Sequence, residues 1–269
     1  MNKDDSKTYL NKDLINEIIS LIKNDNFELA QDKVESLLYK FPLSDIILNL
    51  KGIIYLKKKE YEIAQNNFLE ALKINPRFIS AKLNLGIVYQ SLGKNEEALN
   101  CFKDITKTNN TLPAVYNNMG FILYTQNKYS EAIKKLNKAI ELKKNYTEAF
   151  FNLGMVYLNL KKYKIAIKFF NQSLVHDKKL VSVYYYLGEC YKNIDDINKA
   201  LSYYTLSHHE RTNSRILECY FILNKKEEYQ KLIGNISKNE TDNRRIAAIS
   251  AYISHQFEII NIYPFCQNQ

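Results

Sequence analysis

The stretch AFFNLGMVYLNLKKYKIAIKFF, residues 149–170, decides the fold, because the chain repeats its pattern elsewhere. The segment AKLNLGIVYQSLGKNEEALNCF at 81–102 has the same order of small residues, large apolar residues and a polar turn. The segment AVYNNMGFILYTQNKYSEAIKKL at 114–136 has it again. The three segments differ only in the residues between these shared positions. This recurrence predicts a fold built from copies of one supersecondary element.

Glycine marks the period of the repeat. Glycines stand 34 residues apart at Gly52, Gly86, Gly120, Gly154 and Gly188. Small residues follow at the same interval at Ala64, Ala98, Ala132, Ala166 and Ala200, and large ones at Phe68, Phe102, Leu136, Phe170 and Tyr204. A glycine inside a helix costs about 1 kcal/mol relative to alanine. We therefore expect each glycine to lie in a close packing contact that offsets this cost.

Each repeat predicts a pair of antiparallel helices. In residues 79–97 the apolar side chains recur at helical spacing and form one stripe, and residues 95–107 form a second. The short polar turn SLGKN between them leaves room only for neighbouring, antiparallel helices. The small residues Gly86 and Ala98 would then let the two backbones approach closely.

On these residues the chain resembles the tetratricopeptide repeat (TPR) family, over residues 11–240. The resemblance implies an all-α fold, a right-handed α-solenoid of six full 34-residue helix–turn–helix repeats and a shortened seventh. The expected repeats are 11–44, 45–78, 79–112, 113–146, 147–180, 181–214 and the degenerate 215–240. We expect a short segment at 1–10, a C-terminal helix at 241–262 that caps the last repeat, and an irregular tail at 263–269.

The composition argues against a membrane or secreted protein. No apolar run approaches the roughly 18–20 residues that a membrane-spanning helix needs, and the first residues contain acidic as well as basic side chains, unlike a secretory signal. The four cysteines are far apart and form no CxxC pair. This spacing favours reduced, buried thiols in a cytoplasmic protein.

The sequence offers no catalytic constellation. None of the four histidines has a partner at metal-ligand spacing, and no GxSxG, Walker or GxGxxG motif is present. We therefore expect no enzyme activity within this chain, no cofactor, no metal and no small-molecule substrate.

The first helices of the repeats hold the candidate binding residues. Asn84, Asn118 and Asn152 stand 34 apart, two places before the glycine. An amide can donate to one peptide group and accept from another, so such a row can hold an extended backbone. The resemblance implies the same role, since TPR arms such as that of O-linked N-acetylglucosamine transferase carry asparagines here. Side-chain selectivity is expected from Phe121, Met155, Tyr186 and Glu189.

These residues predict a scaffold that binds a protein or peptide partner in a concave groove. Because asparagine is abundant in this chain, an alternative is that the row is solvated filler.

Two other functions stay open. The segment NRRIAAISAYISHQFEIINIYPFC (243–266) resembles the region between TPR repeats and an iron- and 2-oxoglutarate-dependent oxygenase domain in some bacterial proteins. The chain could then be the substrate-recruiting arm of a larger enzyme. Lysines recur at the turns and the net charge is +9, so nucleic-acid binding is a lesser alternative. Since 33 of the 38 basic residues are lysine, we favour compositional bias over a selected phosphate surface, which usually contains more arginine.

Overall fold

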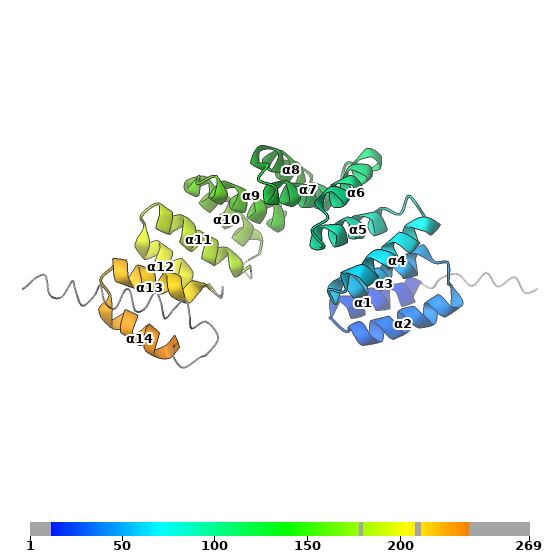
Figure 1. Cartoon of the computed structure of the whole chain (residues 1–269), viewed down its shortest axis with the longest axis horizontal. Helices are drawn as coiled ribbons and strands as arrows, with labels where there is room; N and C mark the ends of the chain where they lie inside the picture. Colours follow the sequence, from blue (N-terminus) through cyan, green and yellow to red (C-terminus); the bar gives the residue numbers. More distant parts are fainter. Residues whose placement is uncertain (1–11, 178–179, 208–210, 237–269) are drawn as a thin grey trace, which may run out of the picture. The chain divides into compact units, whose positions relative to one another are not determined.

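The computed structural model describes residues 12–177, 180–207 and 211–236, and this part of the chain contains α-helices and no β-strand (Figure 1). The first helices of the hairpins are α1 (Lys12–Lys23), α3 (Asp45–Lys57), α5 (Ile79–Ser91), α7 (Pro113–Thr125), α9 (Thr147–Asn159), α11 (Ser182–Asn193) and α13 (Thr212–Ile222). The second helices are α2 (Phe27–Lys40), α4 (Tyr61–Ile74), α6 (Asn95–Thr108), α8 (Tyr129–Leu142), α10 (Tyr163–His176), α12 (Ile197–Thr205) and α14 (Lys226–Ile236). The predicted all-α fold of helical hairpins is confirmed.

The helices belong to two compact units. Unit 1 ends at Asn127 and contains α1–α7, and unit 2 begins at Lys128 and contains α8–α14. In each unit, the two helices of a hairpin pack against each other, as α3 does with α4 and α9 with α10. The second helix also packs on the first helix of the next hairpin, as α4 does on α5. The starts of α3, α5, α7 and α9 follow the 34-residue period.

The repeated glycines pack against aromatic rings of the second helix. A Cβ atom added to Gly86 would lie 2.5 Å from a ring carbon of Phe102, and one added to Gly154 would lie 2.5 Å from Phe170. The same contact joins Gly52 to Phe68 and Gly188 to Tyr204. Carbon atoms cannot approach this closely, so the ring occupies the space that a larger residue would need. The predicted packing role of the glycines is confirmed at these positions.

The turn within each hairpin has one residue in the left-handed conformation. Positive φ angles recur every 34 residues at Asp25, Lys59, Gly93, Asn127, Lys161 and Asp195, and once more at Asn224. The backbone N–H of the next residue donates to a carbonyl five residues earlier, and the first helix ends there. Lys94 N–H, for example, donates to the Tyr89 carbonyl at 2.8 Å. This is a Schellman motif, in which glycine is usual at the left-handed position. Among these seven turns, only the one at Gly93 has glycine there.

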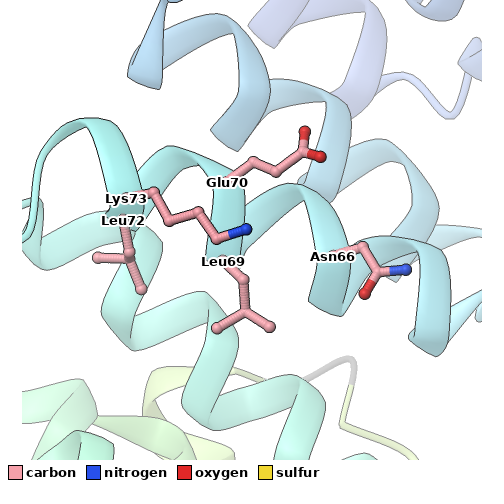
Figure 2. Close-up of a pocket in the computed structure, with 5 residues that line it drawn as sticks. All are labelled: Asn66, Leu69, Glu70, Leu72 and Lys73. Atoms are coloured by element: carbon pink, nitrogen blue, oxygen red, sulfur yellow. The ribbon is translucent and has the colours of Figure 1, made fainter.

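A hollow lies along α4 (Figure 2). It is about 420 Å³ in volume and is lined by Asn66, Leu69, Glu70, Leu72 and Lys73. All five residues belong to one second helix, so the hollow is separate from the residues predicted on the first helices.

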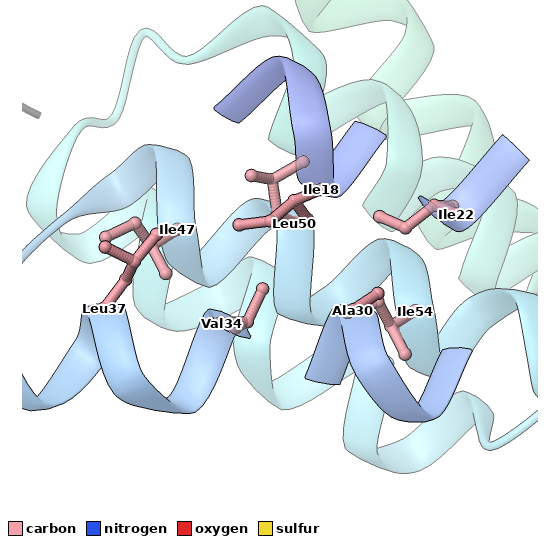
Figure 3. Close-up of a cluster of buried hydrophobic side chains, with 8 residues drawn as sticks. All are labelled: Ile18, Ile22, Ala30, Val34, Leu37, Ile47, Leu50 and Ile54. Carbon is pink, nitrogen blue, oxygen red and sulfur yellow. The ribbon is translucent and has the colours of Figure 1, made fainter. Parts of the chain in front are cut away.

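The first hairpin replaces the glycine contact with an aliphatic one. Ile18 stands where the later repeats have glycine, Val34 stands where they have an aromatic residue or Leu136, and both side chains are fully buried. They belong to a core cluster formed by α1, α2 and α3 (Figure 3): Ile18, Ile22, Ala30, Val34, Leu37, Ile47, Leu50 and Ile54. In this hairpin the larger side chain, Ile18, comes from the first helix and not from the second, so the space between the two helices is still filled. Each fully buried isoleucine in it contributes about 1.5–3 kcal/mol.

The last described hairpin is shorter than the others. Its left-handed turn residue, Asn224, follows Asp195 after 29 residues instead of 34, and α13 begins at Thr212, slightly before the expected 215. The predicted segment 1–10, the capping helix 241–262, the tail 263–269 and the oxygenase-like stretch 243–266 lie outside the described residues.

Candidate protein-interaction surface

The predicted binding residues lie on first helices but belong to different units. Unit 1 contains Asn84 on α5, and Asn118 and Phe121 on α7; unit 2 contains Asn152 and Met155 on α9, and Tyr186 and Glu189 on α11. Their environments differ, so each is considered in its own unit.

Asn84 is bonded within the chain. Its Nδ2 donates to Oδ1 of Asn49 at 3.1 Å, which ties α5 to α3. Asn49 is buried and Asn84 is half-buried. An asparagine amide offers two donor hydrogens and a carbonyl with two lone pairs, so this bond uses only part of the capacity of Asn84. The two amides therefore hold each other in place. The 34-residue period did not predict this pair, because Asn49 stands one place outside the asparagine row.

Asn118 is the asparagine of the row that is open. Its side chain is half-exposed and forms no hydrogen bond with any residue that the structure describes. Phe121 lies almost one turn further along α7, is also half-exposed, and has its ring centroid 6.2 Å from that of Tyr124. An amide and an aromatic ring are therefore side by side on α7, three residues apart.

Asn152 of unit 2 is more enclosed. Only 8% of it is exposed, and it already interacts within the chain. Met155, one turn further along α9, is partly buried and packs against the core that α9, α10 and α11 share. Asn152 therefore offers less surface to a ligand than Asn118 does.

Tyr186 lies in a cluster of aromatic rings. It stacks on Phe170 at 5.8 Å between centroids and meets the edge-on ring of Phe151 at 5.6 Å. Burial raises the pKa of its phenol, an effect to which neighbouring Tyr185 adds. The ring therefore contributes mainly to packing, in the geometries that aromatic pairs prefer.

Glu189 accepts hydrogen bonds from two neighbouring helices. The Tyr204 hydroxyl of α12 donates to its Oε1 at 2.6 Å, and Arg215 of α13 approaches the same oxygen through Nε at 2.7 Å. Arg215 also pairs with Glu218 at 3.1 Å, and Lys192 pairs with Glu218 in turn. We call these five residues the ionic network. Its carboxylates are engaged within the chain, so Glu189 holds α11, α12 and α13 together.

The ionic network changes the proton affinities of its members. Burial alone would lower the pKa of Arg215, but the carboxylates of Glu189 and Glu218 raise it. Burial, then the hydrogen bond to Glu189, raises the pKa of Tyr204 well above its ordinary 10.0. Arg215 is therefore cationic and Tyr204 neutral at any physiological pH. The sequence pattern did not predict this network, although Glu189 and Glu218 share the 29-residue spacing of Cys190 and Cys219.

The described residues contain no cluster of metal-ligating side chains. No group of three His, Cys, Asp or Glu side chains is arranged to hold a metal ion there. Burial raises the pKa of the Cys190 thiol to about 12, and those of Cys101 and Cys219 to about 11. Thiols with such values are poor nucleophiles. Within the same ranges, every helix is too short or too polar to cross a bilayer.

Models of one repeat family match the chain at four places. Those described as tetratricopeptide repeat match residues 47–78, 78–106 and 147–180, and one described as TPR repeat matches 122–161. No curated protein matches the chain. The resemblance of 243–266 to an oxygenase-linked region finds no support among these matches.

Solved structures with the same fold are distant in sequence. PilF of Pseudomonas aeruginosa is 22% identical, with a TM-score of 0.65 over 76% of this chain and 96% of that one. Cut9, in its hetero-tetramer with Hcn1 from the APC/C, is matched with a TM-score of 0.74 at 17% identity, over 92% of this chain and 50% of that structure's chain. A tetratricopeptide repeat protein of Parabacteroides merdae is 16% identical, with a TM-score of 0.63 over 90% and 98%. At these identities the likeness establishes the fold alone.

Proposed function

We propose that this chain, which is a tetratricopeptide repeat protein, binds an extended segment of a partner protein along the first helices of unit 1. Arrays of such repeats are protein-interaction scaffolds in general, because stacked helix pairs present long surfaces to a partner. The segment and its site are our proposal.

The observation that carries the proposal is the open amide of Asn118. A half-exposed amide without a hydrogen bond to any described residue can donate to a peptide carbonyl and accept from a peptide N–H. Such recognition holds the backbone of a segment whatever its side chains are. Water satisfies the amide in the free protein, so binding replaces one set of hydrogen bonds with another at little cost.

The neighbours of Asn118 suit an extended segment. Phe121 offers an aromatic surface on the same helix, which would take an apolar side chain of the partner. On α5, the paired amides of Asn84 and Asn49 leave hydrogen-bonding capacity unused. We propose that Asn118 and Phe121 are the main contacts, Asn84 a supporting one, and that Asn152, Met155, Tyr186 and Glu189 act chiefly through packing and bonding in unit 2.

The experiment compares the proteins that three forms of this chain capture. The chain is immobilised as wild type, as the Asn118→Ala, Phe121→Ala double variant, and as Asn66→Ala, which removes an exposed amide from second helix α4. Proteins captured from the source cell are identified, and a peptide from the captured region is then titrated by calorimetry. We expect the double variant to lose about 2–3 kcal/mol of binding free energy, and Asn66→Ala to bind as wild type does.

A measurement of thermal unfolding separates binding from folding. Both side chains are partly buried, so the double variant is expected to melt somewhat below the wild type and to remain folded at the temperature of the titration. A double variant that is folded at that temperature and binds the peptide as the wild type does would show that the segment lies elsewhere.

A further inference from the structure

The positive charge of the chain is concentrated in a short region. Residues 128–176 contain ten lysines, no arginine and three acidic residues, so they account for +7 of the net charge of +9. Residues 1–127 and residues 177–269 contribute +1 each. A compositional bias alone would spread lysine evenly along the chain, so this concentration needs a local explanation.

The exposed side of α10 gathers much of this charge. Lys161 and Lys162 in the turn, and Lys164 and Lys168 on the helix, are all exposed. Lys164 and Lys168 are four residues apart on α10 and so lie on one face of the helix, while Lys161 and Lys162 stand in the turn just before it. We call these four residues the lysine stripe. The helix α10 itself has no acidic residue.

The lysine stripe is unneutralised. None of its four ammonium groups pairs with a carboxylate in the part of the chain that the structure describes. The second helices α2, α4, α6 and α8 each have a glutamate in the first turn, whereas α10 has none and has Lys164 there. A cation near a helix N-terminus is unfavourable by about 0.3–1 kcal/mol. The arrangement lowers stability locally, as expected of a surface kept for a partner.

Two apolar side chains lie on the same exposed side of α10. Ile165 is 41% exposed and Val175 is 73% exposed. Val175 continues the stripe seven residues after Lys168, two turns further along the helix. The surface therefore combines cations with apolar area that water does not favour.

We propose that the lysine stripe, with Ile165 and Val175, is a second interaction surface that binds an acidic segment of a partner protein, one with a few apolar side chains among its carboxylates. Charge complementarity sets the sign of the partner, and the apolar pair favours a polypeptide over a nucleic acid. This surface lies on a second helix and does not depend on the segment proposed to bind the first helices.

The test uses a defined probe and the full chain. A fluorescein-labelled peptide of glutamates interspersed with leucines is titrated by anisotropy at low and at physiological ionic strength. We expect Lys164→Glu combined with Lys168→Glu to weaken binding at least about tenfold, and added salt to weaken binding to the wild type. Glutamate at position 164 also suits the helix dipole, so the variant is expected to fold.

A matched variant controls for net charge. Lys57→Glu with Lys103→Glu changes two exposed lysines of unit 1 by the same total charge and leaves α10 intact. Its affinity is expected to stay within about twofold of the wild type, since the lysines and apolar side chains of the stripe surface are unchanged. Replacement of Ile165 and Val175 by serine is expected to weaken binding about threefold and to spare the salt dependence.

Three results would overturn the proposal. One is equal loss of affinity in the stripe variant and the unit 1 variant, which would mean attraction to net charge alone. Another is unchanged binding by a stripe variant that circular dichroism shows to be folded. The third is a single-stranded oligonucleotide of equal charge that binds more tightly than the peptide and is lost with the stripe, which would assign the surface to nucleic acid.

Discussion

Units 1 and 2 build their hairpins from the same contact and differ in the chemistry around it. In unit 1, Gly86 faces the ring of Phe102, and nothing polar extends from that ring. In unit 2, Gly188 faces Tyr204, whose hydroxyl continues to Glu189. The first helices of unit 1 are joined by the amide pair Asn49–Asn84, whereas α11 and α13 are joined by the ionic network. The contact between glycine and ring is thus the same in both units, whereas the hydrogen bonds and ion pairs around it differ.

The physical reason is that packing constrains volume and leaves polar groups at its edge free to vary. A glycine and a ring must fit together in every repeat, because a gap or an overlap costs several kcal/mol. A hydroxyl added at the edge of the ring requires only a hydrogen-bond partner. Net charge also differs, since unit 1 has +1 and residues 128–269 have +8.

The largest effect is expected from the shared contact. Phe102→Ala should lower the free energy of unfolding of unit 1 by about 3–5 kcal/mol, since it empties a fully buried site. Urea denaturation followed by circular dichroism measures this change.

A double-mutant cycle sharpens that test. Gly86→Ala alone should destabilise by about 1–3 kcal/mol because its methyl group meets the ring. In the Phe102→Ala background the same change should become neutral or stabilising, because the methyl group gains space and alanine favours the helix by about 1 kcal/mol. Additive effects would be evidence against the contact.

The next largest loss of stability is expected when the ionic network is disrupted. Glu189→Gln should destabilise unit 2 by about 1.5–3 kcal/mol, because it leaves Arg215 half-buried with a weaker partner. Glu148→Gln changes an exposed carboxylate on α9 and should have little effect. Hydrogen exchange read separately for the two units should locate the loss in α11–α13. A loss spread equally over unit 1 would contradict this role.

Alkaline pH should distinguish the two units. Burial raises the pKa of Tyr146 to about 12 and, with further causes, those of Tyr186, Tyr203 and Tyr204, all in unit 2; Tyr89 is the corresponding case in unit 1. Above pH 10 these phenols keep their protons in the folded chain and lose them in the unfolded chain. Unfolding then releases protons, so stability falls as the pH rises.

Hydrogen exchange during an alkaline titration, with tyrosinate absorbance as the second signal, should show unit 2 opening before unit 1. The buried thiol of Cys190 should add to this loss from about pH 9, where an unfolded thiol begins to ionise. Simultaneous opening of both units would contradict the assignment of the buried phenols.

The smallest effect is expected at the turns, where the units should behave alike. Lys59→Gly in unit 1 and Lys161→Gly in unit 2 replace residues with φ of 64° and 56°. Each should stabilise by about 0.5–1 kcal/mol, because glycine relieves the left-handed strain of about 1–2 kcal/mol and loses part of the gain to entropy. Gly93→Ala should have the opposite sign. Thermal unfolding measures all three, and opposite signs at positions 59 and 161 would show that the turns are not equivalent.

The sequence by itself determined the repeat and its packing. Residues three, four and 34 apart carry that information, so the helices, their pairing and the packing role of the repeated glycines could be predicted from local patterns, while the structure showed that the ring of Phe102 is what Gly86 faces. The sequence also placed Asn118 and Phe121 on one helix, where they lie. It could not tell which asparagine is open, because the burial of a side chain is decided only when the helices have packed.

Only the tertiary structure decided the long-range polar links and the turn conformations. The bond from Asn84 to Asn49 joins different positions of two repeats, and Glu189 finds Tyr204 and Arg215 at separations that are not the period. Such partners are selected by distance and direction after the helices have packed. Lysine adopts the left-handed conformation at 59 and 161 because the Schellman bonds and the adjoining helices hold the backbone there, against the local preference of the residue.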